Sequence, residues 1–180
     1  MTSSKTENRR KALFVAYLPQ TPFGTIGLAA SETDLAFLDL HADPKEFEAK
    51  LHAQGFTLQR GESFILLQAM EQLQAYFSRS RKIFDLPIDW QRFTPFQERV
   101  LRATLAIPYG QVKTYAEIAQ EIGNPRATRA VGRAEAHNPL PIVIPCHRVI
   151  SSRGSLRGYS APGGIETKAR LLRLEGLTLI

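Results

Sequence analysis

The chain has 180 residues, of which 43% are hydrophobic and 22% are charged, so its composition is that of a globular protein and excludes a wholly disordered chain. Its single cysteine excludes an intramolecular disulfide and is typical of a reducing compartment. The polar N-terminus is not followed by the apolar stretch of a signal peptide, and no run approaches the roughly 20 apolar residues of a membrane span. We therefore expect a cytoplasmic protein without a membrane partner.

The net charge of +6 is concentrated in the second half of the chain. Residues 1–90 carry 10 Lys and Arg against 11 Asp and Glu, whereas residues 91–180 carry 13 against 6. Such asymmetry favours a half that binds a polyanion, attached to a nearly neutral half. A solvated basic surface explains the charge equally well, so charge alone leaves both interpretations open.

The first half of the chain predicts a mixed α and β domain behind a flexible tail at residues 1–11. Short apolar runs with Pro and Gly turns are typical of strands, and apolar residues at Leu66, Met70, Leu73 and Phe77 have helical spacing. In chain order we expect strands within 12–31 and 33–40, helices at 44–55 and 62–80, and a further strand at 82–90.

The second half predicts a helix-turn-helix. Thr94 and Gln97 form the pattern of a capping box, as do Thr114 and Glu117, so each threonine begins a helix. The second of these helices is short and ends at Gly123, and a third is expected at 126–137. A last helix is expected over 165–176.

The third helix carries Arg126, Arg129 and Arg133, whose spacing predicts one shared face. The alanines around them, Ala127 and Ala130 among them, allow the helix to approach another surface closely. Arginines on such a helix can contact phosphates or enter a DNA groove. The alternative is an exposed basic face with no ligand.

The lone cysteine, Cys146, lies in PIVIPCHRVI, directly before His147 and Arg148. A buried, inert thiol is the simplest interpretation, but both neighbours could favour the reactive thiolate. Adjacent residues of an extended segment point to opposite faces, so either the backbone turns here or a water relays the proton. Glu175 is a candidate to orient the histidine. A zinc site needs about four ligands, and the sequence shows no such set.

Together these motifs resemble the O6-alkylguanine-DNA alkyltransferase family, also called methylated-DNA–protein-cysteine methyltransferases. The resemblance rests on FQERVLRATLAIPYGQVKTYAEIA, GNPRATRAVGRAEAHNPLPIVI and PCHRVI, and on TPFGTIGLAAS in the first half. It implies an α+β protein with a small ribonuclease H-like α/β domain at 12–91 and a helix-turn-helix, winged-helix-like domain at 92–180.

The resemblance also implies an activity, which is DNA repair by direct reversal. Such proteins bind double-stranded DNA, flip out an O6-alkylguanine, less often an O4-alkylthymine, and transfer its alkyl group irreversibly to their own cysteine. The expected protein needs no cofactor or metal, is a monomer that could bind DNA cooperatively, and is nucleoid-associated in a bacterium or archaeon.

By this resemblance each matching residue acquires an expected role. Cys146 is the nucleophile, His147 is its base through a bridging water, and Glu175 holds the histidine. Tyr115 donates a proton toward guanine N3, and Asn138 braces the cysteine segment. The expected DNA contacts are Arg126, Ala127, Arg129, Ala130, Gln97 and Ser152, with Arg129 taking the place of the flipped base. The expected base pocket is formed by Pro141, Val149, Tyr159 and Ser160.

Two departures and two alternatives accompany the resemblance. The loop at 160–167 is about two residues longer than the family form, and Thr128 and Arg133 replace smaller residues. A DNA-binding regulator without chemistry would explain the helices and the charge. A thiol hydrolase would use Cys146 and His147 without DNA.

Overall fold

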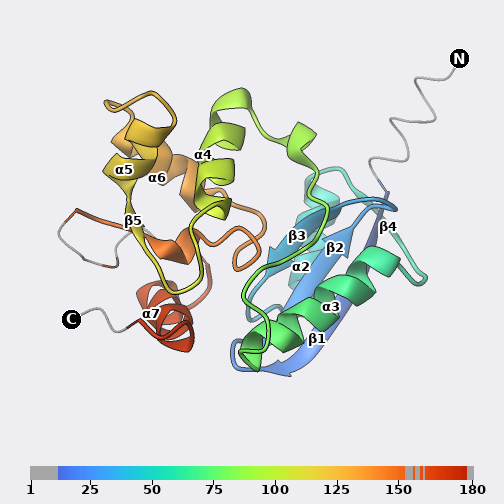
Figure 1. The fold of residues 1–180 in the computed structure, drawn as a ribbon. Coiled ribbons are helices and arrows are strands. Elements are labelled where there is room, and N and C mark those ends of the chain that lie inside the picture. Colours follow the sequence, from blue (N-terminus) through green and yellow to red (C-terminus); the bar gives the residue numbers. More distant parts are fainter. Residues whose placement is uncertain (1–11, 153–155, 157–158, 160, 178–180) are drawn as a thin grey trace, which may run out of the picture. The chain divides into compact units, whose positions relative to one another are not determined.

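The computed structural model describes residues 12–152, 156, 159 and 161–177, and the chain divides into two compact units, 1–89 and 90–180. The N-terminal unit is built on a four-stranded sheet with strand order β3-β2-β1-β4 (Figure 1). Strands β1 to β3 are antiparallel neighbours, whereas β4 pairs in parallel with β1. The strands are β1 (Ala12–Thr21), β2 (Gly24–Ala30), β3 (Leu35–Asp39) and β4 (Thr57–Gln59).

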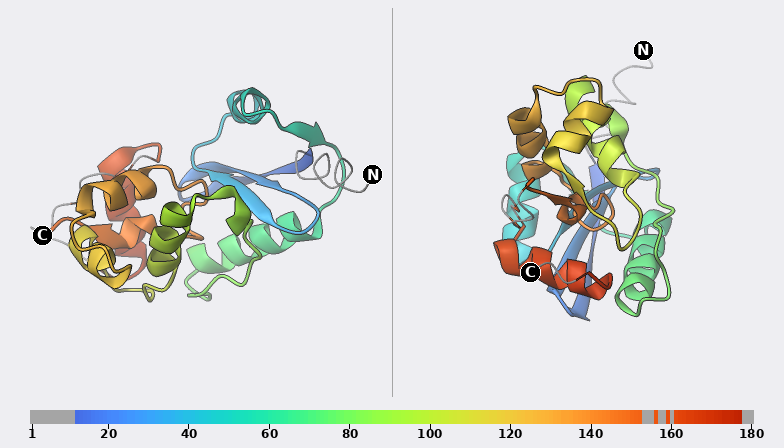
Figure 2. Two further views of the ribbon diagram at one scale, coloured as in Figure 1. Left: turned by 90° about the horizontal axis from the view of Figure 1, so that it is seen from above. Right: turned by 60° about the vertical axis from the view of Figure 1, so that its left-hand side comes forward.

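Two helices cover opposite faces of this sheet, as Figure 2 shows from above: α2 (Pro44–Ala53) and α3 (Phe64–Phe77). Phe47 and Leu51 of α2 pack with Leu13 and Ala29 in one apolar cluster. The helices expected over 44–55 and 62–80 are confirmed. Their starts follow from local chemistry, because Asp43 and Ser63 accept hydrogen bonds from the first free amides of α2 and α3.

The strand expected at 82–90 is wrong. The segment forms only a single bridge, between Ile88 and Leu35, among the described residues. The backbone of Asp85 bonds instead to the side chain of Gln72 on α3, through both its amide and its carbonyl at 2.8 Å. Pro87 has no amide proton to give to a neighbouring strand.

The C-terminal unit packs its helices around Val100, Ile107, Ile118, Val131 and Val149, all almost fully buried. Its helices are α4 (Pro95–Leu105), α5 (Tyr115–Glu121), α6 (Thr128–Ala136) and α7 (Gly164–Leu174). Two 3-10 turns, η1 (Trp90–Arg92) and η2 (Cys146–Arg148), and a parallel pair, β5 (Lys113–Thr114) with β6 (Val149–Ile150), complete it.

Both predicted capping boxes are confirmed, at Thr94 with Gln97 and at Thr114 with Glu117. The third helix begins later than expected, at Thr128. The Ala127 amide donates to the Asn124 carbonyl at 2.9 Å, which closes a turn over residues 124–127. Arg126 therefore lies in that turn and does not share a helix face with Arg129 and Arg133. None of the described helices is both long and apolar enough to cross a bilayer.

Candidate active site

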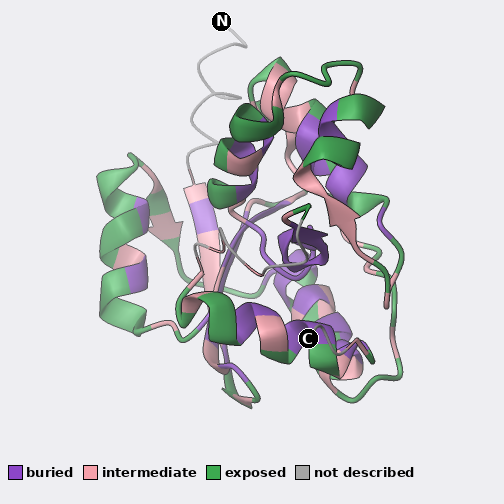
Figure 3. Ribbon diagram, turned by 90° about the vertical axis from the view of Figure 1, so that its left-hand side faces the viewer, coloured by how far each residue is buried: buried purple, intermediate pink, exposed green. Residues whose placement is uncertain are grey.

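The cysteine segment runs through the interior of the C-terminal unit. Every residue from Leu140 to Ile150 is buried, and Figure 3 shows the turn η2 within this buried stretch. Asn138 fastens the segment from its N-terminal side, because its Nδ2 donates to the Ile144 carbonyl at 2.8 Å and its Oδ1 accepts from the Leu140 amide at 3.0 Å. Ile142 adopts a left-handed φ of 74°, a strained conformation for a β-branched residue that the surrounding packing must hold.

The backbone turns at the cysteine instead of continuing as a strand. Cys146, His147 and Arg148 form the 3-10 turn η2, with the Arg148 amide donating to the Pro145 carbonyl at 2.8 Å. Cys146 is 7% exposed and His147 is fully buried. The two side chains therefore leave one tight turn, which is the first of the two geometries considered for this dipeptide.

Glu175, which follows α7 directly, accepts hydrogen bonds from two other segments of the chain, the turn η2 and the loop at Gly110. His147 Nε2 lies 2.8 Å from its Oε1, Arg148 donates through Nε and Nη2, and the Gly110 amide donates at 3.2 Å. Gly110 needs the freedom of glycine, since its φ is 75° and a Cβ would lie 3.2 Å from the Glu175 carbonyl oxygen. Burial would raise the pKa of Glu175, but the hydrogen bonds and charges of His147 and Arg148 outweigh it and lower this pKa to about 2.

These contacts define the state of His147. Burial lowers its pKa, although Glu175 opposes the shift, so the ring is neutral near pH 7. A carboxylate accepts only, which places the ring proton on Nε2 and leaves Nδ1 as the basic nitrogen. Nδ1 is buried and has no hydrogen-bond partner among the described residues. A neutral base with an unused lone pair thus follows the thiol directly in the chain.

The resting thiol is protonated. Burial raises the pKa of Cys146 to about 12, with the charge of Glu135 adding to the effect. The Asn138 side chain and the cation of Lys168 act in the opposite direction and favour the thiolate. Arg148 is expected from the sequence to favour the thiolate. Its guanidinium group instead donates to Glu175 and, at 2.6 Å, to the Ile107 carbonyl. The cation that favours the thiolate is therefore Lys168.

Lys168 and Glu135 were missed in the sequence. Lys168 is fully buried on α7, and its Nζ donates to the Val149 carbonyl at 2.5 Å. A signal existed, because Leu171 and Leu172 define the buried face of α7 and one turn back on that face lies Lys168. Burial lowers the pKa of Lys168 to about 8, with Cys146 and Glu135 opposing the shift.

Two tyrosine rings lie close to the Lys168 ammonium group. Its Nζ is 5.9 Å from the ring centroid of Tyr115 and 6.0 Å from that of Tyr159. Tyr115 begins α5, and a Cβ added to Gly132 of α6 would lie 3.9 Å from its ring. Burial, helped by Glu135 and Cys146, raises the pKa of Tyr115 to about 12. The Tyr159 hydroxyl is buried and has no partner among the described residues.

The remaining predicted residues fall into two groups. Pro141 and Val149 are buried within the cysteine segment, and Ser160 lies outside the described residues. The expected DNA contacts do not belong to the buried cluster. Arg126, Arg129, Ala130 and Ser152 are exposed, and Ala127 and Gln97 are half-buried. The side chain of Gln97 caps α4 by accepting from the Thr94 amide, and its backbone amide donates to Thr94 Oγ1 at 3.3 Å.

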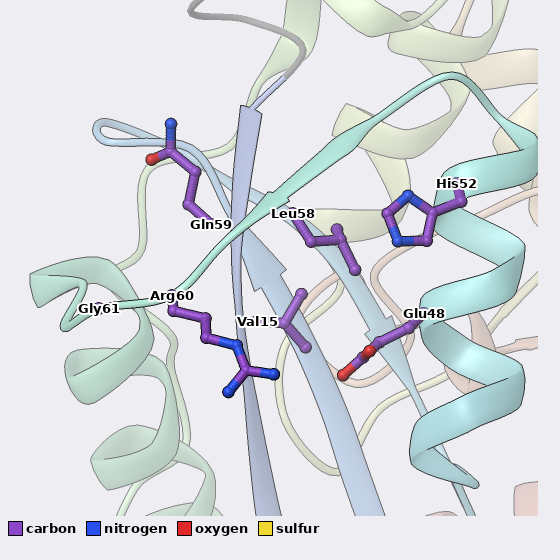
Figure 4. A pocket seen from close by; sticks show the side chains of 7 residues that line it. All are labelled: Val15, Glu48, His52, Leu58, Gln59, Arg60 and Gly61. Atoms are coloured by element: carbon purple, nitrogen blue, oxygen red, sulfur yellow. The ribbon is translucent and has the colours of Figure 1, made fainter.

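Within the described part of the chain, no cluster of three or more His, Cys, Asp or Glu residues could hold a metal ion. A pocket of about 550 Å³ belongs to the N-terminal unit, between α2 and strands β1 and β4 (Figure 4). Glu48 on its wall accepts from the Tyr17 hydroxyl at 3.0 Å, and His52 Nδ1 lies 3.1 Å from the Phe56 carbonyl oxygen. None of the predicted catalytic residues lines this pocket.

Comparison with known proteins matches both halves of the chain. The family model described as 6-O-methylguanine DNA methyltransferase, ribonuclease-like domain, matches residues 13–90, and that of the DNA binding domain matches residues 95–177. A Methanosarcina acetivorans protein named methylated-DNA–protein-cysteine methyltransferase is 41% identical over 157 residues, covering 87% of this chain and 95% of its own length. A Mycobacterium tuberculosis protein of that name is 52% identical over 107 residues, 59% of this chain and 63% of its own length.

A crystal structure of the Mycobacterium tuberculosis OGT protein in complex with DNA is similar to this fold, with a TM-score of 0.73 and 39% identity. The match covers 91% of this chain and 92% of that one. The expected α+β fold, a ribonuclease-like domain followed by a DNA-binding domain, is confirmed.

Proposed function

The chain belongs to the methylated-DNA–protein-cysteine methyltransferase family, and on this premise we propose that Cys146 takes the alkyl group from O6 of an alkylated guanine in DNA. The chain has a single cysteine, so no other residue can be the acceptor of this family's reaction. A thioether forms and is not hydrolysed, so each molecule repairs one lesion. The observation that supports this role best is the buried, unpartnered Nδ1 of His147, the residue that follows the cysteine.

The first step is removal of the thiol proton. His147 Nδ1 accepts it through a bridging water, because no direct hydrogen bond joins the thiol to this nitrogen among the described residues. The Glu175 carboxylate holds Nε2–H at 2.8 Å, which keeps the acceptor nitrogen facing the reaction and stabilises the imidazolium that forms. Lys168 and Asn138 stabilise the thiolate.

The second step is displacement at the alkyl carbon. The thiolate sulfur forms a bond to that carbon while the carbon–O6 bond breaks, and its electron pair passes to the guanine ring. Tyr115 donates its phenolic proton toward guanine N3 to neutralise this charge. The Lys168 cation, 5.9 Å from the Tyr115 ring, favours the phenolate left behind. The proton lost by Cys146 balances the one gained by guanine once Tyr115 is protonated again.

The substrate base must reach this interior by leaving the duplex. Arg129, exposed on α6, fills the place of the flipped guanine, while Arg126 and the backbone at Gln97 and Ser152 hold the DNA strands. Of the residues expected to receive the base, Pro141 and Tyr159 lie in the described part of the chain and form one wall of the pocket that we propose.

Intact-protein mass spectrometry after mixing with a duplex oligonucleotide that contains O6-methylguanine tests this function. We expect one added methyl group per protein, mapped by peptide analysis to Cys146, and none on Cys146→Ser, which should still bind DNA. Tight DNA binding without a mass change would indicate a lesion-binding regulator instead. Hydrolysis of an ester without DNA would indicate a thiol hydrolase.

A further inference from the structure

Glu135 is a buried carboxyl group in the C-terminal unit that the mechanism above does not use. It lies on α6, is 3% exposed, and faces inward beside Val131 and Ala134, whereas Arg129 and Arg133 of the same helix are exposed. A carboxyl group is rarely buried unless hydrogen bonds or a counter-charge compensate it. The cost of burying Glu135 therefore depends on whether its carboxyl group is protonated.

The hydrogen bonds of Thr104 indicate that Glu135 carries a proton. Thr104 Oγ1 on α4 bonds both to the Val100 carbonyl, at 3.0 Å, and to Glu135 Oε1. A hydroxyl has one proton, and the carbonyl can only accept, so the bond to Val100 uses it. The second bond then needs a proton on Glu135. Its other oxygen, Oε2, is buried without a partner among the described residues, which also disfavours the anion.

The titratable groups whose charges couple to that of Glu135 belong to three other elements and include the reacting groups. They are Tyr115 of α5, Cys146 of η2 and Lys168 of α7. Burial raises the pKa of Glu135 to about 7, although the Lys168 cation opposes the shift. An ionised Glu135 raises the pKa of both Cys146 and Tyr115.

We propose that Glu135 is a charge switch for alkyl transfer, which permits the Cys146 thiolate while its carboxyl group is neutral and opposes that thiolate once it ionises. This proposal rests on the proposed function of Cys146. Glu135 acts through Cys146 and Tyr115 and does not touch the substrate, so it is a positioning residue. On ionisation its proton passes to solvent, and no other reactant is required.

The sign of the pH effect follows from this coupling. Below about pH 7 Glu135 is neutral, and each rise in pH increases the thiolate fraction in the ordinary way. Above about pH 7, the negative charge of Glu135 repels that of the thiolate, so the thiolate fraction increases less steeply with pH. With a pKa of about 7, roughly three-quarters of Glu135 is ionised at pH 7.5. A switch that permits transfer only in the neutral form therefore places the wild-type rate about fourfold below that of a permanently neutral residue.

Glu135→Gln tests the switch, because glutamine keeps an oxygen and adds an NH₂ group toward Thr104 but carries no charge. Single-turnover transfer from the O6-methylguanine duplex should be within about 1.5-fold of wild type at pH 6 and about fourfold faster at pH 7.5. The range stops there because Lys168, with a pKa of about 8, begins to lose its charge above it. Glu121→Gln, an exposed glutamate paired with Lys113, is the control and should leave the profile unchanged.

A measurement without DNA separates this proposal from the proposed function. The alkylation rate of the single cysteine by iodoacetamide, followed by mass spectrometry from pH 6 to 7.5, should rise more steeply in Glu135→Gln than in wild type. Parallel profiles for the two proteins in both assays would overturn the switch, whereas absent transfer with divergent iodoacetamide profiles would overturn only the proposed function. If the variant does not fold, carbon-13 NMR of wild-type glutamate carboxyls decides, because the proposal requires one to titrate near neutrality.

Discussion

At the scale of single residues, Glu175 joins three segments of the C-terminal unit through one buried carboxylate. Glutamine at this position leaves the Arg148 cation buried without a counter-charge. We therefore predict that Glu175→Gln lowers the free energy of unfolding by about 3–5 kcal/mol. Urea unfolding at pH 7, followed by the fluorescence of the single tryptophan, Trp90, measures the change.

The pH dependence of the same variant distinguishes charge from shape. Because the folded pKa of Glu175 is lowered to about 2, its stabilisation is present above the unfolded pKa of about 4.3 and is lost as the pH falls through about 2. Glu175→Gln should lose less stability than wild type over that interval. Glu166→Gln, on α7 in an exposed pair with Arg173, should cost less than about 1 kcal/mol at pH 7. Equal stability of the Glu175 and Glu166 variants would contradict this account.

The roles of the residues in the cysteine segment could be predicted because these residues adjoin one another in the sequence. Cys146 and His147 are neighbours, and the cap residues Thr94 and Thr114 act over three residues. Glu135 and Lys168 could not be assigned in this way. Their importance depends on burial near Cys146, which results from the packing of α6 and α7 into the unit. The local pattern of α7 indicates only that Lys168 lies on the same face as Leu171 and Leu172.

At the scale of elements, α6 has a buried face that carries Glu135 and an exposed face that carries Arg129 and Arg133, for which we propose contact with DNA. Arg129 and Arg133 are both exposed on it and carry the same charge. If Arg129 replaces the flipped base, its side chain offsets an unstacking cost of a few kcal/mol that a free base does not incur. Arg129→Ala should therefore slow transfer from duplex DNA at least about tenfold while changing reaction with free O6-benzylguanine less than twofold.

The comparison with Arg133→Ala separates position from charge. This variant removes one positive charge from the same helix and should weaken DNA binding without the selective loss in duplex repair. Rates measured under single-turnover conditions at saturating DNA isolate the flipping step from affinity. Losses of equal size on duplex and free base in Arg129→Ala would exclude its role in flipping.

Elements with strong periodic patterns or caps could be predicted, and those defined by remote partners could not. Helices α3, α4 and α5 have apolar spacing or a capping box in their own sequence. The short strands β5 and β6 exist only because residues 113–114 and 149–150 pair across the unit. The strand predicted at 82–90 shows the opposite case. Its composition is typical of a strand, but hydrogen bonds to the Gln72 side chain hold the segment in another conformation.

At the scale of the whole molecule, charge divides as the fold does. Residues 1–90 have a net charge of −1 and residues 91–180 of +7, while the boundary between the two compact units lies between Asp89 and Trp90. Some of the basic residues of the C-terminal unit are buried in its interior, among them Arg148 and Lys168. Others are exposed, namely Arg99, Arg126, Arg129 and Arg133, whereas the exposed Arg102 and Arg173 pair with Glu98 and Glu166.

This distribution predicts that DNA affinity depends steeply on salt and that the dependence belongs to the C-terminal unit. Each phosphate contact contributes a slope of about −0.9 to log affinity against log salt, so about four contacts reduce affinity on the order of 100-fold between 50 and 200 mM salt. Fluorescence anisotropy with a labelled duplex measures the slope. Arg126→Ala should reduce it by about one, whereas Lys45→Ala, exposed on α2, should not change it. A salt-independent affinity, or an equal effect of the two variants, would refute the assignment of the basic unit to the DNA backbone.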